Sequence, residues 1–393
     1  MYSRSEKIAF SSRLHWDLQP NRLSAAVERK RLRGEPLLDL TESNPTRAGF
    51  RYPEGEILQA LADPRALGYR PAPLGAEEAR VAVAEYYGVR VETSRIVLTT
   101  GTSESYGLLF KALADPGDEV LVPRPSYPLF DFLASLESVR AVQYPLHYHG
   151  GWYIDCDALE AAVTPRTRAI VLVNPNNPTG SFLKRGELER LGSICRRHGL
   201  VLISDEVFAD YAFEEDAPRV ASLVDAGEVP AFSLSGLSKV SGLPQMKLGW
   251  IVVSGPAEFQ AAALARLELI ADTYLSVGTP VQLAAEALLG VRTEFQRQLV
   301  DRLSGNLAFL RERAARSPSM RVLDVEGGWY ATLRVPGIRS EEEWVLELLE
   351  QDGVLVQPGF FFDFESEAFL VMSLMTPEEE FRAGIERIFS RDV

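Results

Sequence analysis

The sequence predicts an α/β protein: a mostly parallel central sheet flanked by helices, with a smaller α+β domain beside it. Between about residues 95 and 255, short runs rich in β-branched residues alternate with amphipathic stretches of helical spacing. Buried apolar strands that alternate with helices are typical of a parallel sheet covered on both faces. At 393 residues the chain is long for one hydrophobic core, which favours two lobes.

The central region divides into strands and helices in a regular order. Right-handed crossovers between parallel strands place all the strand ends, and any ligand, along one edge of the sheet. The predicted strands are 95–100, 119–122, 169–173, 200–203, 231–234 and 250–253, and the predicted helices include 103–113 and 184–198.

The remainder of the chain has a different pattern. Residues 256–316 are largely helical, with a break at Gly278-Thr279-Pro280, and residues 320–390 show the mixed pattern of an α+β unit. The elements expected in that unit are strands at 321–325 and 330–335, a helix at 341–350 and then two short strands.

These patterns predict two domains. The large domain covers residues 45–290 and contains the central sheet. The small domain combines an N-terminal arm, residues 1–44, with residues 291–393.

The composition excludes several classes of protein. Hydrophobic residues make up 46% of the chain and charged residues 24%, as is ordinary for a globular protein. The net charge of −14 disfavours binding to a phosphate backbone, so we expect no nucleic acid partner. No apolar run approaches the ~20 residues that span a bilayer, and the N-terminus lacks the apolar segment of a secretory signal. With only two cysteines, Cys156 and Cys195, we expect a soluble cytoplasmic protein without a membrane partner.

Three polar motifs follow predicted strands. They are Asn174-Pro-Asn-Asn-Pro-Thr-Gly180, Ser204-Asp205-Glu206 and Ser233-Leu-Ser-Gly-Leu-Ser-Lys239. A lysine in a Ser/Gly loop can form an imine with an aldehyde and then act as a base that moves a proton between carbon centres. An isolated loop lysine is usually a surface residue. However, a strand-terminal Asn, a strand-terminal Asp and then such a lysine form the layout that pyridoxal phosphate chemistry needs.

With these motifs the chain resembles the fold-type I pyridoxal-phosphate enzymes, and within them the class I and II aminotransferases. The resemblance runs from about Asp39 to the last predicted helix. It implies a large domain like that of the pyridoxal-phosphate-dependent transferases and identifies Lys239 as the Schiff-base lysine. It also implies that Ser235 or Ser238 binds the cofactor phosphate.

Asp205 is expected at a strand end on the ligand edge. An ionised carboxylate there can pair with the pyridine nitrogen and keep it protonated, which makes the ring a better electron sink. The alternative is that Asp205 caps a following helix, which Glu206 would favour.

The resemblance assigns four further positions. Asn177 would donate to the phenolic oxygen of the cofactor, although its Pro- and Gly-rich surroundings also suit a simple turn. Tyr127 is similar to the aromatic residue that stacks on the ring. Gly101-Thr102-Ser103 joins a strand to a helix, where free N–H groups attract phosphate, although Thr and Ser also cap helices in general. Tyr69 resembles the tyrosine that reaches the cofactor of the partner subunit, which implies a homodimer.

Three positions depart from the family pattern. Phe208 stands where a tyrosine usually donates to the phenolic oxygen, and Tyr211 is a candidate substitute. Lys247 replaces an arginine on the phosphate and provides a point charge without bidentate geometry. Val371 aligns with the arginine that binds the substrate α-carboxylate.

A cation elsewhere can compensate for Val371, or the substrate lacks a carboxylate at that place. Asn44, Arg47 and Arg51 lie where the family's N-terminal substrate segment would be. Surface exposure of these arginines is the equally weighted alternative.

The leading hypothesis is therefore an aminotransferase that moves an amino group from an amino acid to a 2-oxo acid by a ping-pong mechanism. The alternatives are a pyridoxal-phosphate lyase or decarboxylase, an aminotransferase for an amine without the usual carboxylate, and a non-enzymatic cofactor-binding regulator. We expect no metal, because the four histidines form no recognised ligand spacing, although His147 and His149 can share one face of a strand.

Overall fold

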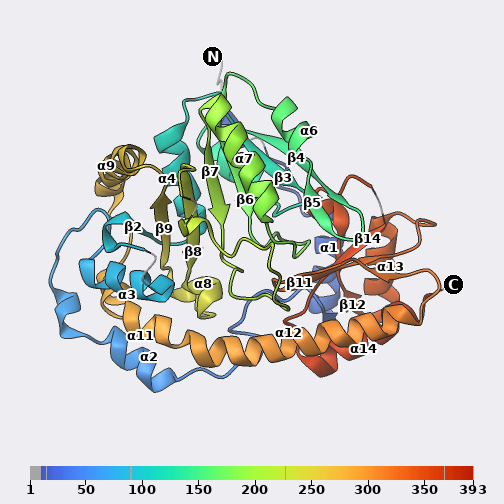
Figure 1. Cartoon of the computed structure of the whole chain (residues 1–393). Helices are drawn as coiled ribbons and strands as arrows, with labels where there is room; N and C mark the ends of the chain where they lie inside the picture. The colour runs from blue at the N-terminus through green and yellow to red at the C-terminus, as the bar shows by residue number, and fades with distance from the viewer. Residues whose placement is uncertain (1–9, 15, 89–90, 226, 367, 393) are drawn as a thin grey trace, which may run out of the picture.

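The computed structural model describes residues 10–14, 16–88, 91–225, 227–366 and 368–392. An eight-stranded sheet, a four-stranded sheet and a separate two-stranded pair organise these residues, and helices cover them (Figure 1). The prediction of an α/β fold with a smaller α+β part is confirmed. Within the described residues, none of the helices combines the length and the apolar character needed to span a bilayer.

The large sheet has eight strands in the order β2-β9-β8-β7-β6-β3-β4-β5. Five neighbouring strands, from β8 to β4, run parallel, whereas β9 and β5 run antiparallel to their neighbours. The strands are β2 (Ile96–Thr99), β3 (Glu119–Arg124), β4 (Arg140–Tyr148), β5 (Trp152–Ile154), β6 (Thr167–Val173), β7 (Val201–Asp205), β8 (Ala231–Gly236) and β9 (Gly249–Ser254).

Apolar residues on both faces bury the middle of this sheet. In β6, Ile170 and Leu172 belong to one core cluster, and Ala169 and Val171 belong to another on the opposite face. Helix α7 contributes to the first cluster, and helices α4 and α9 contribute to the second. The helices interspersed with the large-sheet strands are α4 (Thr102–Leu113), α5 (Phe130–Leu136), α6 (Cys156–Ala161), α7 (Arg185–His198) and α8 (Leu237–Val240), and α9 (Ala257–Tyr274) follows β9.

The strand registers align the polar motifs at one edge. Val173 pairs with Asp205, and Asp205 pairs with Leu234, so β6, β7 and β8 end close to one another. Asp205 is the last residue of β7, and Asn177 and Lys239 lie just after the ends of β6 and β8, as the crossover argument predicts.

The small sheet is antiparallel, with the order β10-β11-β14-β13, and a separate parallel pair joins β1 to β12. This pair brings the N-terminal segment against the C-terminal part of the chain. The elements are β1 (Leu38–Asp39), β10 (Arg321–Val322), β11 (Tyr330–Arg334), β12 (Val354–Leu355), β13 (Gln357–Pro358), β14 (Phe369–Ser373), α13 (Glu341–Asp352) and α14 (Glu378–Phe389).

The ends of α13 follow from local sequence. Ser340 accepts from the backbone N–H of Glu343, whose carboxylate accepts from Ser340 N in return, so both free donors are satisfied. Gly353 ends the helix in the left-handed region, at φ 63°.

The longest helix, α12 (Arg292–Ala315), runs beneath both sheets (Figure 1). The break predicted near Gly278 is present: α9 ends at Tyr274, and a new helix begins at Thr279. The remaining helices are α1 (Arg22–Leu32), α2 (Glu54–Leu61), α3 (Glu77–Tyr87), α10 (Thr279–Leu283) and α11 (Ala285–Gly290).

Candidate active site

A cleft of about 190 Å³ lies at the edge where β6, β7 and β8 end. We call it the Lys239 cleft. Most of the cofactor residues predicted from the sequence meet in it. The lining residues are Ser43, Gly101, Thr102, Tyr127, Val173, Asn177, Asp205, Val207, Phe208, Gly236, Ser238, Lys239 and Tyr330.

Lys239 projects from the short helix α8, directly after β8. Its Nζ lies 4.6 Å from the ring centroid of Trp329 and 5.6 Å from that of Phe208. Burial lowers the pKa of the Lys239 amino group to about 8, and the nearby Asp205 carboxylate partly opposes this shift. A lysine amine with this pKa is partly neutral near pH 7, as a nucleophile or base must be.

Asp205 closes β7 and is buried. One carboxylate oxygen accepts from Val207 N at 3.3 Å, and the other accepts from the hydroxyl of Tyr106 at 3.3 Å. Burial raises the pKa of Asp205 to about 6, whereas these two donors and Lys239 lower it. After Glu206 the chain enters a turn rather than a helix, so helix capping does not explain Asp205.

Glu206 has a structural environment instead. It is buried, and its carboxylate accepts from the Ser222 and Ser233 hydroxyls and from Leu223 N. Burial raises its pKa to about 7. With several donors, this acid fixes the chain that follows β7.

The N-terminus of α4 borders the cleft and suits an anion. Gly101 precedes the helix, and the exposed Lys247 extends its Nζ toward that residue. A Cβ on Gly249 would lie 2.8 Å from Gly101 Cα and 3.0 Å from the Ser235 carbonyl oxygen. Only glycine therefore allows the helix end and the end of β8 to approach this closely. The result is a positive helix end with a nearby cation, an arrangement that suits an anion such as a phosphate.

Asn177 Oδ1 and Ser235 Oγ are among the buried polar atoms that have no hydrogen-bond partner in the described residues, and both lie near this edge. The turn around Asn177 is otherwise well paired. The side chain of Asn174 donates to Val220 O at 2.9 Å and accepts from Leu183 N, and Asn176 donates to Pro125 O. Unpaired buried groups cost free energy unless a ligand or water satisfies them.

The residues of the cleft therefore fit pyridoxal phosphate. Gly101, Thr102 and Ser238 stand where a phosphate would bind, and Asp205 offers a carboxylate to a ring nitrogen. The side-chain amide of Asn177 lines the cleft, and its Nδ2 group is the donor that a phenolic oxygen would need. Tyr127 presents an aromatic ring to the same space.

The other predicted residues lie outside the lining. Ser103 is exposed in the first turn of α4, and Tyr69 is 79% exposed on the loop before α3. Asn44 uses its side-chain oxygen to accept from Thr46, although its neighbour Ser43 lines the cleft. Arg47 is exposed.

Val371 is fully buried in β14. It pairs with Thr332 and Gln357 across the small sheet and belongs to the apolar cluster that includes Leu323 and Phe364. The position is thus occupied by packed hydrocarbon, and no arginine stands in the cleft lining among the described residues.

Several site residues were missed by sequence reasoning. Ser43, Tyr330 and Val207 line the cleft, while Tyr106 contacts Asp205 and Trp329 contacts Lys239. The Gly-Gly break before Trp329 and Tyr330 was visible as a boundary between strands but carried no chemical signal.

Tyr211 does not supply the phenol that Phe208 lacks. Its hydroxyl donates to the backbone carbonyl of Lys239, and its side chain is buried. Because a tyrosine has one proton to donate, this bond leaves Tyr211 without a donor for the cofactor.

Within the described ranges, no group of three or more His, Cys, Asp or Glu side chains could hold a metal ion. His147 Nε2 instead lies 3.3 Å from Asp155 Oδ2.

Comparison with known proteins agrees with this geometry. The sequence matches the family described as aminotransferase class I and II over residues 35–388. It is 31% identical to the glutamate-pyruvate aminotransferase AlaA of Escherichia coli, over 86% of each chain. It is 30% identical to the alanine aminotransferase of Mycobacterium tuberculosis, over 90% of this chain and 85% of that one.

Among solved structures, an aminotransferase from Escherichia coli superposes with a TM-score of 0.86 at 27% identity, over 98% of both chains. No finding favours the lyase alternative. The chain therefore belongs to the class I and II aminotransferases and is a pyridoxal-phosphate-dependent enzyme.

Proposed function

We propose that the Lys239 cleft is the active site of this aminotransferase, and that it transfers an amino group from an amino acid to a 2-oxo acid in two half-reactions. One observation carries the proposal: the amine of Lys239, the carboxylate of Asp205 and the side-chain amide of Asn177 converge at one sheet edge. When bound, pyridoxal phosphate supplies a pyridine ring that withdraws electrons from the substrate α-carbon.

The residues around the cofactor divide the work of binding. Asp205 would pair with the ring nitrogen and Asn177 with the phenolic oxygen, while Tyr127 would stack on the ring face. The phosphate would be held at the N-terminus of α4 and the end of β8, where the contributing residues are Gly101, Thr102, Ser103, Ser235, Ser238 and Lys247. These assignments rest on the family resemblance, and the donors, charges and aromatic ring present at those points support them.

Lys239 would be both the attachment point of the cofactor and the base that moves the substrate proton. Its pKa of about 8 suits proton transfer near neutral pH. Asp205, with a pKa of about 6, would be ionised under the same conditions. The cleft thus contains a base that must be neutral, Lys239, and a carboxylate that must be charged, Asp205. Proton transfer with stabilisation of the developing charge needs both.

L-Alanine and L-glutamate are the first amino donors to test, with a 2-oxo acid as acceptor. Two relatives are named for glutamate–pyruvate and alanine aminotransfer, which supports L-alanine or L-glutamate as donor and a 2-oxo acid such as pyruvate as acceptor. Asn44 and Arg47 lie beside Ser43 and would approach the substrate from the N-terminal segment.

A second candidate substrate is an amine without an α-carboxylate. The fully buried Val371 supports it, because hydrocarbon there cannot form the charge-assisted contact worth roughly 1.5–3 kcal/mol. If the substrate is an amino acid, another cation must neutralise its carboxylate.

The proposal extends to assembly and location. The exposed Tyr69 supports a homodimer in which this residue reaches the partner's cofactor. The boundaries proposed for the domains remain 45–290, and 1–44 with 291–393. The two free, buried cysteines support a reducing, cytoplasmic location.

The test is an absorbance titration of the purified protein with single L-amino acids and simple amines, followed by identification of the released cofactor. Conversion to pyridoxamine phosphate by L-alanine or L-glutamate would support the amino-acid proposal. Conversion only by amines would support the second candidate. A cofactor that stays in the aldehyde form while the donor is consumed would refute transamination.

A further inference from the structure

The backbone of the lysine segment is fixed by side chains from three other parts of the chain. A helix of four residues such as α8 leaves its last carbonyl groups without partners inside the helix. Here the Tyr211 hydroxyl donates to the carbonyl of Lys239, and Gln296 Nε2 donates to Val240 O at 2.8 Å. Tyr52 donates to Gly242 O at 2.8 Å. Lys239 thus emerges from an immobilised backbone.

The amino end of Lys239 meets an aromatic surface. Its Nζ lies 4.6 Å from the Trp329 ring centroid, closer than the 5.6 Å to Phe208. The two rings contact each other edge to face at 5.2 Å, and Tyr211 packs against Trp329 at 5.4 Å. A cation over a ring face is attracted by the quadrupole of the ring, most strongly for tryptophan and when both are shielded from water.

Trp329 reaches this position from the small-sheet side of the molecule. It directly precedes β11, and its carbonyl accepts from Leu374 N at 2.8 Å, just after β14. Gly328 N donates to Tyr211 O at 2.8 Å, and a Cβ on Gly327 would lie 2.4 Å from the same oxygen. Glycine at 327 therefore lets the Trp329 segment lie directly against the loop that carries Phe208 and Tyr211.

We propose that Trp329 is a positioning residue for Lys239: its indole face holds the amino group while Tyr211 holds the backbone, so that the small sheet sets the direction of the lysine. Nothing in the sequence motifs points to Trp329. The inference rests on the proposed role of Lys239, but it concerns a property of the lysine that exists without cofactor.

The contact with Trp329 should shift the pKa of Lys239 in a direction that can be measured. Burial lowers the pKa of Lys239, and the aromatic face acts the other way because it favours the protonated amine. The titratable groups around the amine are Asp205 from β7, Tyr127 after β3, Tyr330 from β11 and Tyr211. Of these, Asp205 raises the pKa of Lys239.

The test measures the pKa of Lys239 in cofactor-free protein, from the pH dependence of its acetylation by acetic anhydride, with the modified peptide identified by mass spectrometry. Trp329→Leu should lower the pKa by about one unit, and Trp329→Phe, which keeps a ring, by less. A merely structural role predicts the opposite sign, since water entering a loosened core would raise the pKa toward its ordinary value. An unchanged or raised pKa would overturn the proposal.

Fluorinated tryptophans at position 329 provide a second measurement that preserves shape and so does not depend on the folding of Trp329→Leu. Each added fluorine weakens the ring quadrupole, so the Lys239 pKa should fall stepwise. A flat series would overturn the proposal. Tyr211→Phe is the companion variant: it removes the hydrogen bond to the Lys239 carbonyl but keeps its own ring and Trp329, so it should shift this pKa less than Trp329→Leu does.

Failure of this inference is separable from failure of the proposed function. If Lys239 were not the cofactor lysine, Lys239→Ala would keep its aminotransferase turnover whatever the acetylation data show. If Trp329 does not hold the amine, the Lys239→Ala enzyme would still be inactive, and only the pKa series would fail.

Discussion

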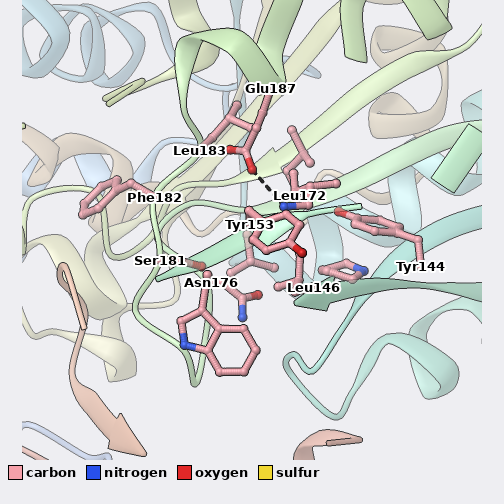
Figure 2. Close-up of a pocket in the computed structure, with 13 residues that line it drawn as sticks. Tyr144, Leu146, Tyr153, Leu172, Asn176, Ser181, Phe182, Leu183 and Glu187 are labelled. Atoms are coloured by element: carbon pink, nitrogen blue, oxygen red, sulfur yellow. Dashed lines mark hydrogen bonds between the residues drawn. The ribbon is translucent and has the colours of Figure 1, made fainter. Parts of the chain in front are cut away.

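The Lys239 cleft and the cavity beside Glu187 are neighbours that share Val173 in their walls. The Glu187 cavity, shown in Figure 2, lies between β5, β6 and the start of α7, and it includes Tyr144, Asn176 and Phe182. Each pocket has a carboxyl group whose pKa is raised by burial: Asp205 in one and Glu187 in the other.

Their hydrogen-bond partners differ. One oxygen of Glu187 accepts from Ile154 N at 2.8 Å, the bond drawn in Figure 2, and the other accepts from Lys184 N at 2.8 Å. The carboxylate thus joins β5 to the N-terminus of α7 in a capping arrangement. The two contacts of Asp205 are both 3.3 Å long.

The two pockets also differ in how many of their buried polar atoms lack hydrogen-bond partners. Around Glu187, Tyr144 donates to Val171 O and the Asn176 side chain is bonded on both its atoms. Among the buried polar side-chain atoms of the described residues that line the cavity, only the Trp152 indole nitrogen lacks a hydrogen-bond partner. The edge near Lys239 leaves both Asn177 Oδ1 and Ser235 Oγ unpaired. Two short backbone bonds give the Glu187 carboxylate a structural role, whereas Asp205 lies at an edge where other buried polar atoms are unpaired, as the proposed binding of a ligand there requires.

Removing the Lys239 amine should have the largest effect on turnover of all the changes that distinguish the two pockets. Lys239→Ala is expected to lower aminotransferase turnover to below about a thousandth of wild type, because the cleft lining in the described residues offers no other amine. Turnover is measured with an amino acid and a 2-oxo acid that support the wild-type reaction.

Lys184→Ala is the matched control. Lys184 is also partly buried, but its Nζ bridges Asp216 and Glu326 at 2.6 and 2.7 Å at the edge of the Glu187 cavity. Its loss should lower stability and leave turnover per folded molecule nearly unchanged. Retained turnover in Lys239→Ala would contradict the assignment of the site.

The two acids provide the next test. Asp205→Asn should reduce turnover by roughly a hundredfold or more, because an amide cannot stabilise a protonated ring nitrogen as a carboxylate does. Glu187→Gln should leave turnover per folded molecule within about twofold but lower stability by about 1–2 kcal/mol, since it weakens a helix cap. Equal losses of turnover in both variants would show that the two pockets do not differ as argued.

The stability of cofactor-free protein should depend on pH through Asp205. The folded pKa of about 6 lies above the ordinary value of 3.8, so between these values the folded state binds more protons than the unfolded state. Stability therefore falls as pH rises from about 4 to 6. A two-unit shift corresponds to roughly 3 kcal/mol at most.

Asp205→Asn should remove this contribution and stabilise cofactor-free protein at pH 7 by about 1–3 kcal/mol. Urea unfolding of both proteins at pH 4.5 and pH 7 gives their free energies of unfolding. The difference between wild type and Asp205→Asn at each pH isolates the contribution of Asp205, because the other titratable groups are common to both proteins. If the free energy of unfolding of the variant at pH 7 equals that of wild type, burial of the ionised Asp205 carboxylate does not destabilise the folded protein. A gain in stability together with a loss of turnover is the behaviour expected of a functional acid.

Sequence patterns predicted the buried middle of the fold better than its edges. Strands such as β6 and β7 are apolar on both faces, so their runs are continuous and easy to recognise. Strand β4 was missed because it lies near the sheet edge and is largely exposed or half-buried along its length. Short helices such as α5 and α6 offer too few turns to establish a period.

The residues of the candidate site also fall into two groups, those that the sequence predicted and those that it did not. Asp205, Asn177 and Lys239 were predictable because each follows a recognisable strand, and topology alone brings strand ends together. Trp329 and Tyr106 were not, because tertiary packing brings them to Lys239 and Asp205 from a different sheet and from the interior of a helix. A sequence pattern contains no signal for such contacts.

The smallest predicted effect concerns Phe208, whose ring lines the cleft where the family has a hydroxyl donor. Tyr211 cannot compensate because it is bonded to the carbonyl of Lys239. Phe208→Tyr should therefore lower the pKa of the bound cofactor's chromophore by about one unit, the amount expected from one new hydrogen bond to a charged oxygen. An absorbance titration against pH measures the shift. Tyr211→Phe should not reproduce it, because that change removes a donor used elsewhere. An unchanged pKa in Phe208→Tyr would mean that the new hydroxyl does not reach the phenolic oxygen, and the contribution of Asn177 would then be the only hydrogen bond predicted at that atom.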